Sequence, residues 1–66
     1  MTVTVNGQAR QLSAATTVAA LLAAIGLDPR QVAVERNEEI VPRSAYAVTR
    51  LAHGDALEIV HFIGGG

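Results

Sequence analysis

The hydrophobic and polar positions at the start of the chain alternate with the two-residue period of a strand. Residues 2–5 follow this pattern, and Asn6-Gly7 comes next, a dipeptide that favours a two-residue hairpin turn. The chain is therefore expected to turn back and set Val3 opposite Arg10. This register puts Arg10 on the apolar face of the hairpin, so either a bulge shifts the pairing or the arginine reaches past the sheet edge into solvent.

One helix is predicted by apolar residues spaced three and four positions apart. The stripe consists of Val18, Leu21, Leu22 and Ile25. Thr17, directly before the stripe, is a suitable N-cap. Gly26 provides a left-handed stop at the C-terminal end, and Pro29 prevents the helix from continuing.

The rest of the chain alternates like strands again. Residues 32–35 form the third predicted strand and residues 39–41 a short fourth, which ends before Pro42 because proline cannot donate a ladder hydrogen bond. Tyr46 is expected to close one end of the core. Residues 57–63 form the last strand. The order of elements predicts an α+β fold, with one main helix packed across a mixed sheet of four or five strands.

The predicted core takes nearly all of the large aliphatic side chains, since a chain of 66 residues buries only about 60% of its unfolded surface. One domain is expected over residues 1–63, followed by a glycine tail over residues 64–66. The core is predicted to contain Val3, Val5, Val18, Leu21, Leu22, Ile25, Val32, Val34, Ile40, Leu51, Leu57 and Ile59.

Composition narrows the classes of function. The absence of cysteine excludes disulfides and thiolate chemistry on this chain. The five basic residues are all arginines, spread along the sequence against six acidic ones, so no basic stripe for nucleic acid is expected. We find neither a signal peptide nor a membrane span, and we expect a cytoplasmic protein.

Conventional catalytic groups are not predicted. His53 and His61 are eight positions apart without a carboxylate or cysteine at ligand spacing, which disfavours a metal site or a general base. Glu38 and Glu39 are neighbours, and adjacent residues of a strand or turn point apart. We therefore expect no catalytic residue, bound metal or bound cofactor of the chain's own.

The glycine tail is the strongest candidate for function. Gly64, Gly65 and Gly66 follow a strand rich in β-branched residues and provide an arm without side chains. Such an arm can thread a narrow channel and present its carboxylate to another protein. A frayed end without a role is the alternative interpretation.

Strand parity in residues 57–63 predicts a surface beside this tail. Because Leu57 and Ile59 are expected to point inward, Glu58, Val60 and Phe62 share the outward face. Exposed apolar side chains next to the arm indicate anchors for a partner protein.

The sequence resembles the ThiS-type sulfur carriers of thiamine biosynthesis, which have the ubiquitin-like β-grasp fold. The resemblance covers essentially the whole chain. It is carried by the Thr-Val-x-x-Leu-Leu motif at residues 17–22, by the segments at residues 34–43 and 54–60, and by the Gly65-Gly66 end. An additional glycine, Gly64, stands where some members have a larger residue, and we interpret it as slack in the arm.

This resemblance implies a cycle of C-terminal chemistry. A ThiF-like enzyme would use ATP to adenylate the Gly66 carboxylate, and sulfur from a cysteine desulfurase route would displace AMP to leave a thiocarboxylate. That sulfur would pass to a ThiG-like thiazole synthase. The chain itself would be a co-substrate of these enzymes and not an enzyme.

Other members of the fold class remain alternatives. The small subunit of molybdopterin synthase and the carriers of cysteine synthesis are similar in fold and in their glycine ends. A ubiquitin-like modifier would join the same carboxylate to lysines of other proteins; the lack of lysine here excludes only lysine-linked chains of itself. A plain interaction domain with an inert tail is the third class.

Overall fold

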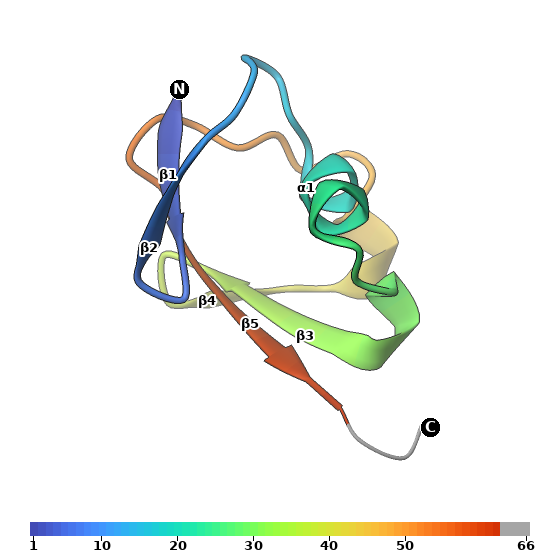
Figure 1. The fold of residues 1–66 in the computed structure, drawn as a ribbon. Helices are drawn as coiled ribbons and strands as arrows, with labels where there is room; N and C mark the ends of the chain where they lie inside the picture. The colour runs from blue at the N-terminus through green and yellow to red at the C-terminus, as the bar shows by residue number, and fades with distance from the viewer. Residues whose placement is uncertain (63–66) are drawn as a thin grey trace.

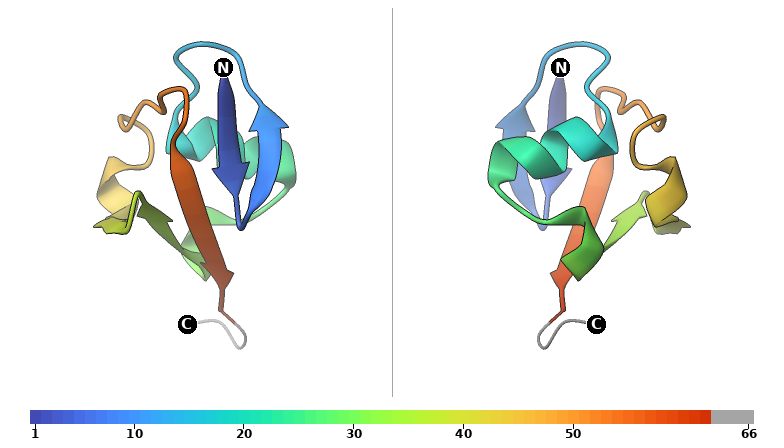
Figure 2. Two further views of the ribbon diagram at one scale, coloured as in Figure 1. Left: turned by 90° about the vertical axis from the view of Figure 1, so that its left-hand side faces the viewer. Right: turned by 90° about the vertical axis from the view of Figure 1, so that its right-hand side faces the viewer.

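A computed structural model of the chain describes residues 1–62. Within this range five strands form one sheet, and a single α-helix covers one of its faces (Figures 1 and 2). The elements are β1 (Thr2–Val5), β2 (Gln8–Gln11), α1 (Val18–Ile25), β3 (Val32–Arg36), β4 (Glu39–Val41) and β5 (Ala56–His61), with short 3-10 turns η1 (Pro29–Gln31) and η2 (Arg43–Ala45).

The sheet is mixed, and its strand order is β2-β1-β5-β3-β4. β1 and β5 run parallel, whereas the β1–β2, β3–β5 and β3–β4 pairs are antiparallel. The predicted α+β architecture is therefore confirmed, with five strands. None of the helices in residues 1–62 is long and apolar enough to span a membrane.

The first hairpin has the predicted register. Val5 lies opposite Gln8 and Val3 opposite Arg10, and the pairing runs through four residues of each strand without a bulge. The turn is tight because Asn6 and Gly7 both adopt positive φ, at 51° and 84°. Without a bulge to shift the register, the Arg10 side chain is nevertheless exposed to solvent.

The helix begins and ends where the sequence indicates. The Thr17 hydroxyl accepts a hydrogen bond from the Ala20 N–H at 3.1 Å, as an N-cap does. Gly26 has φ of 86° and closes the C-terminal end. The buried residues of the helix are Val18, Leu21 and Leu22.

The core contains most of the predicted side chains, but two assignments change. The assignment of Ile40 to the core is wrong, because its side chain is 77% exposed and Val41 is buried instead. Ile25 is only partly buried at the margin. Tyr46 closes one end as expected, with its hydroxyl donating to the buried Val32 carbonyl at 3.4 Å.

The error at Ile40 follows from the length of the turn between β3 and β4. The strands predicted at residues 32–35 and 39–41 leave three residues between them, but β3 continues to Arg36 and the turn uses only Asn37 and Glu38, both at positive φ. Strand pairing then sets Val41 opposite Val34 on the helix side and Ile40 opposite Glu35 on the other side. A single-residue difference in a turn reverses the face of every residue that follows.

Candidate functional site

The predicted functional residues follow β5, which occupies the centre of the sheet between β1 and β3. This strand leads away from the end of the molecule where the chain begins, and its last residues lie at the opposite end (Figure 2). Gly64, Gly65 and Gly66 lie outside the described residues, as does Ile63 at the predicted domain boundary. The structure therefore describes the domain and the strand that precede the tail.

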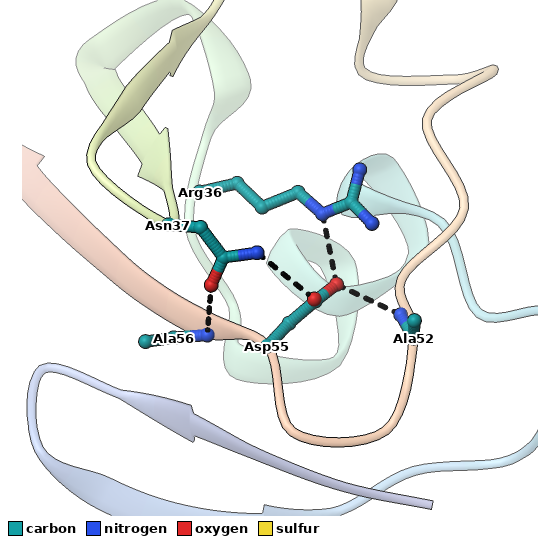
Figure 3. A network of polar contacts seen from close by, with 5 residues as sticks. All are labelled: Arg36, Asn37, Ala52, Asp55 and Ala56. Carbon is teal, nitrogen blue, oxygen red and sulfur yellow. Dashed lines mark hydrogen bonds and ion pairs between the residues drawn. The ribbon is translucent and has the colours of Figure 1, made fainter.

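A polar network fixes the beginning of β5 (Figure 3). Asp55 is only 6% exposed, and its Oδ2 accepts hydrogen bonds from Arg36 Nε and from the Ala52 N–H, both at 2.8 Å. Its Oδ1 accepts from the Asn37 side-chain amide at 3.1 Å. The Asn37 Oδ1 in turn accepts from the Ala56 N–H at 2.9 Å. The network therefore ties the β3–β4 turn to the first residue of β5.

The hydrogen bonds of this network lower the pKa of Asp55. Burial alone opposes the charged form and would raise the pKa of the carboxyl. The Ala52 N–H, the Asn37 amide and the Arg36 guanidinium all stabilise the carboxylate, and together they outweigh burial. Asp55 is therefore an ionised anchor at neutral pH.

A second anchor holds the far half of β5. The Asn6 side chain accepts a hydrogen bond from the Ile59 N–H at 2.8 Å and donates one to the Ile59 carbonyl at 3.1 Å. The Asn6 main-chain N–H also donates to the Leu57 carbonyl at 2.8 Å. The asparagine amide thus acts as an additional peptide group and extends the parallel pairing of β1 with β5 beyond the end of β1.

The side chains of β5 alternate as predicted from Leu57 to Val60, and the strand ends at His61, which is exposed as well. Leu57 and Ile59 are buried beneath the helix, whereas Glu58 is exposed. Val60 is 59% exposed and Phe62 is 48% exposed. The outward exposure expected for Glu58, Val60 and Phe62 is confirmed, so two large apolar side chains lie near the beginning of the tail.

The sheet face opposite the helix, which we call the open face, has a hollow that the sequence did not predict. Its volume is about 470 Å³. Ile40 lies on this face opposite Glu35, and Val60 lies opposite Ala33. The residues that line the hollow include Ala33, Glu35, Glu38, Ile40, Glu58 and Val60. Recognising the two-residue turn at Asn37 would have placed Ile40 here.

One of the two histidines, His53, makes a hydrogen bond within the fold. His53 Nδ1 accepts a hydrogen bond from the Thr2 N–H at 3.0 Å, which gives this side chain a structural role. No group of three or more His, Cys, Asp or Glu side chains in residues 1–62 is arranged to hold a metal ion.

The two neighbouring glutamates also separate. Glu38 lines the hollow of the open face, whereas Glu39 lines a different depression beside Arg36.

Two central parallel strands from the ends of the domain, flanked by antiparallel strands and covered by one helix, define the ubiquitin-like β-grasp fold. The chain is therefore a small β-grasp protein. The ThiS family model matches residues 3–66, and the chain belongs to the ThiS family.

Solved structures and curated proteins agree with this assignment. A crystal structure of the thiamine biosynthesis protein ThiS from Geobacter metallireducens has a TM-score of 0.84 and 36% identity, over 100% of both chains. An NMR structure of a thiamine biosynthesis protein from the same organism has a TM-score of 0.78 and 38% identity, over 100% of this chain and 88% of the other. The sulfur carrier protein ThiS of Bacillus subtilis is 46% identical over 50 residues, which is 76% of each chain.

Two similar proteins are much longer than this chain. A thiazole synthase of Paramagnetospirillum magneticum is 58% identical over 66 residues, and one of Magnetococcus marinus is 44% identical over the same length. These matches cover 100% of this chain but only 20% of either relative. The chain therefore spans about one fifth of the length of these two curated relatives.

The Asp55 anchor makes the stability of the fold depend on pH. Because its folded-state pKa is lowered, its contribution is fully present above the ordinary aspartate pKa of about 3.9 and is lost as the pH falls through the lower folded-state value. Asp55→Asn should cost about 1–3 kcal/mol near neutral pH, since it leaves buried donors without an acceptor.

Urea unfolding of the native chain and of Asp55→Asn between about pH 2 and 6 checks this expectation. Asp28→Asn is the control, because Asp28 pairs with Arg30 at the surface. Asp55→Asn should lose less stability than the native chain on acidification. Parallel pH profiles for the two would contradict the role of Asp55.

Proposed function

We propose that this chain is a sulfur carrier of thiamine biosynthesis that works through its Gly66 carboxylate. The observation that carries the proposal is membership of the ThiS family over nearly the whole chain, glycine end included. The name of the Bacillus relative, a sulfur carrier protein, supports the same function. Two residues separate the end of the anchored β5 from the first of the three glycines, and this strand supports the proposal as a base for a reactive arm.

The chemistry has two steps at one carbon atom. A carboxylate is a poor electrophile, so a ThiF-like enzyme first joins the Gly66 carboxylate oxygen to the α-phosphorus of ATP, and pyrophosphate leaves. The terminal sulfur of a persulfide supplied through a cysteine desulfurase then attacks the carbonyl carbon and AMP leaves, which gives an acyl disulfide with the donor. A second thiol attacks the donor sulfur of this disulfide, is itself oxidised to a disulfide with the donor, and releases the thiocarboxylate. ATP binds to the activating enzyme, and the carrier requires no cofactor of its own.

In this proposal the carrier is a co-substrate and contributes no catalytic residue. The thiocarboxylate delivers its sulfur to a thiazole synthase for the thiazole ring. The names of the Paramagnetospirillum and Magnetococcus relatives support this acceptor, since each thiazole synthase contains a segment similar to this chain. We place the cycle in the cytoplasm, where its activating enzyme finds ATP.

We also propose that Glu58, Val60 and Phe62 form part of the surface that the partner enzymes bind. Glu58 and Val60 are exposed on β5, and Phe62 is exposed directly after the strand ends at His61. Binding there would hold the domain while Gly64 and Gly65 thread the partner's active site. Buried aromatic contacts provide much of the affinity at such interfaces.

The carboxylate requirement is tested by changing the end of the chain. A C-terminal tag, or deletion of Gly66, should abolish ATP-dependent adenylation by the activating enzyme and leave the fold intact, because the reacting group would be masked or displaced. Pyrophosphate release measures the first step, and circular dichroism with thermal melting checks the fold. A tagged chain that still forms an acyl-adenylate would contradict the mechanism.

The binding surface is tested by separate substitutions. Val60→Asp should weaken binding to the activating enzyme and to thiazole synthase by roughly tenfold or more, because a charge would replace an apolar contact. Phe62→Ala should weaken both complexes with little loss of thermal stability, since Phe62 is about half exposed. Calorimetric titrations and thermal melts on the same proteins measure the two effects.

The matched control for Val60→Asp is Val48→Asp, since Val48 is a valine 77% exposed outside β5. This control should bind both enzymes like the native chain. Equal losses of affinity for the two aspartate variants, or a large fall in melting temperature for Phe62→Ala, would remove these residues from the binding surface.

A further inference from the structure

The open face carries like charges at adjacent positions. Glu35 of β3 lies directly opposite Glu58 of β5 in an antiparallel pair. Side chains opposite each other in such a pair have Cβ atoms about 4.5–5.5 Å apart, and like charges at this separation destabilise a sheet. Glu38 lines the same hollow, so three carboxylates surround it.

The described part of the chain does not neutralise this charge by ion pairs. Within residues 1–62, ion pairs join Asp28 to Arg30 and Asp55 to Arg36. Both are separate from the hollow of the open face. Within these residues, neither Glu35 nor Glu58 takes part in an ion pair.

The backbone conformation of Glu38 is also unfavourable for a residue with a side chain. Glu38 adopts φ of 68°, a left-handed conformation in which the second position of this two-residue turn favours glycine. The chain thus has a side chain, and a charged one, at a position where glycine would be less strained. Local choices that oppose folding are expected mainly at functional sites.

Apolar side chains lie beside these carboxylates. Ile40 is 77% exposed in the same row of the sheet as Glu35 and Glu58, and Val60 is in the next row of β5. Glu35 therefore lies between Ile40 and Glu58 across the sheet, and Val60 follows Glu58 on the same face of β5. A partner complementary to this surface must present a positive charge and an apolar group close together.

We propose that the open face docks a protein segment carrying an arginine next to an apolar side chain. The guanidinium lies between the Glu35 and Glu58 carboxylates, and the apolar group packs on Val60, which is next to Glu58 on the same face of β5. Arginine suits this place because its planar fork can donate to two carboxylates at once. The occupant belongs to an enzyme that acts on the end of this chain, so this inference rests on the proposed function.

Docking of this kind relieves the repulsion that the isolated domain contains. The same carboxylates that oppose folding would then favour the complex, and attraction between opposite charges would speed the encounter. If the two carboxylates had a purely structural role, removing one would lower the melting temperature. In the docking proposal, removing one weakens binding but does not lower the melting temperature.

The test uses Glu35→Gln, Glu58→Gln and the double variant. Glu39→Gln is the control. It removes the same charge from β4, but Glu39 precedes Ile40 in that strand and therefore lies on the other side of the sheet. Binding to the purified adenylating enzyme and thiazole synthase of the same cell is titrated without ATP, at about 50 and 300 mM salt.

Each Gln variant at position 35 or 58 should bind at least one enzyme roughly fivefold or more weakly, with a melting temperature equal to or above that of the native chain. The double variant should also lose most of the salt dependence of binding. The Glu39→Gln control should match the native chain in both respects.

Affinities equal to that of the control, an unchanged salt dependence in the double variant, or no binding of the native chain to either enzyme would overturn the docking inference. Binding without ATP does not require a reactive Gly66. A chain that binds in this charge-dependent way but never acquires sulfur would therefore contradict the proposed function and leave the docking surface in place.

Discussion

The pairing of β5 on both of its edges is the constraint on which the rest of the structure depends. This strand runs parallel to β1 and antiparallel to β3, so it joins the first hairpin to the second half of the chain. Asp55 anchors its beginning, and Asn6 extends its pairing toward the end. Because both edges are satisfied, the strand that leads to the tail has a fixed position and direction.

This constraint also divides the sheet into two chemically different faces. One face packs its aliphatic side chains against the helix, and in a domain this small that packing provides most of the stability. The other face is uncovered and carries Val60 and Ile40 beside Glu35 and Glu58. Since the alternation of a strand is strict, the residues that stabilise the fold and those available to a partner are neighbours in sequence.

Local chemistry made most of the fold predictable from the sequence. The Asn6-Gly7 turn, the Thr17 cap and the alternation in β5 each act within a few residues, and all three were confirmed. Ile40 was misplaced because its face depends on a turn in which Glu38 stands where glycine is usual. The hollow and the Asp55 network were missed because they join side chains from separate segments, which no short-range pattern reveals. The roles of Gly64, Gly65 and Gly66 remain predictions.

The central claim is that sulfur is carried on the carboxyl carbon of Gly66. The most direct measurement is the intact mass of the protein purified from its native cell, with fragmentation of the C-terminal peptide. The account predicts a population in which one oxygen of Gly66 is replaced by sulfur, and this population should disappear when the activating enzyme is deleted. A chain that continues beyond Gly66 in the cell, or one that carries only the plain carboxylate while thiamine is being made, would contradict it.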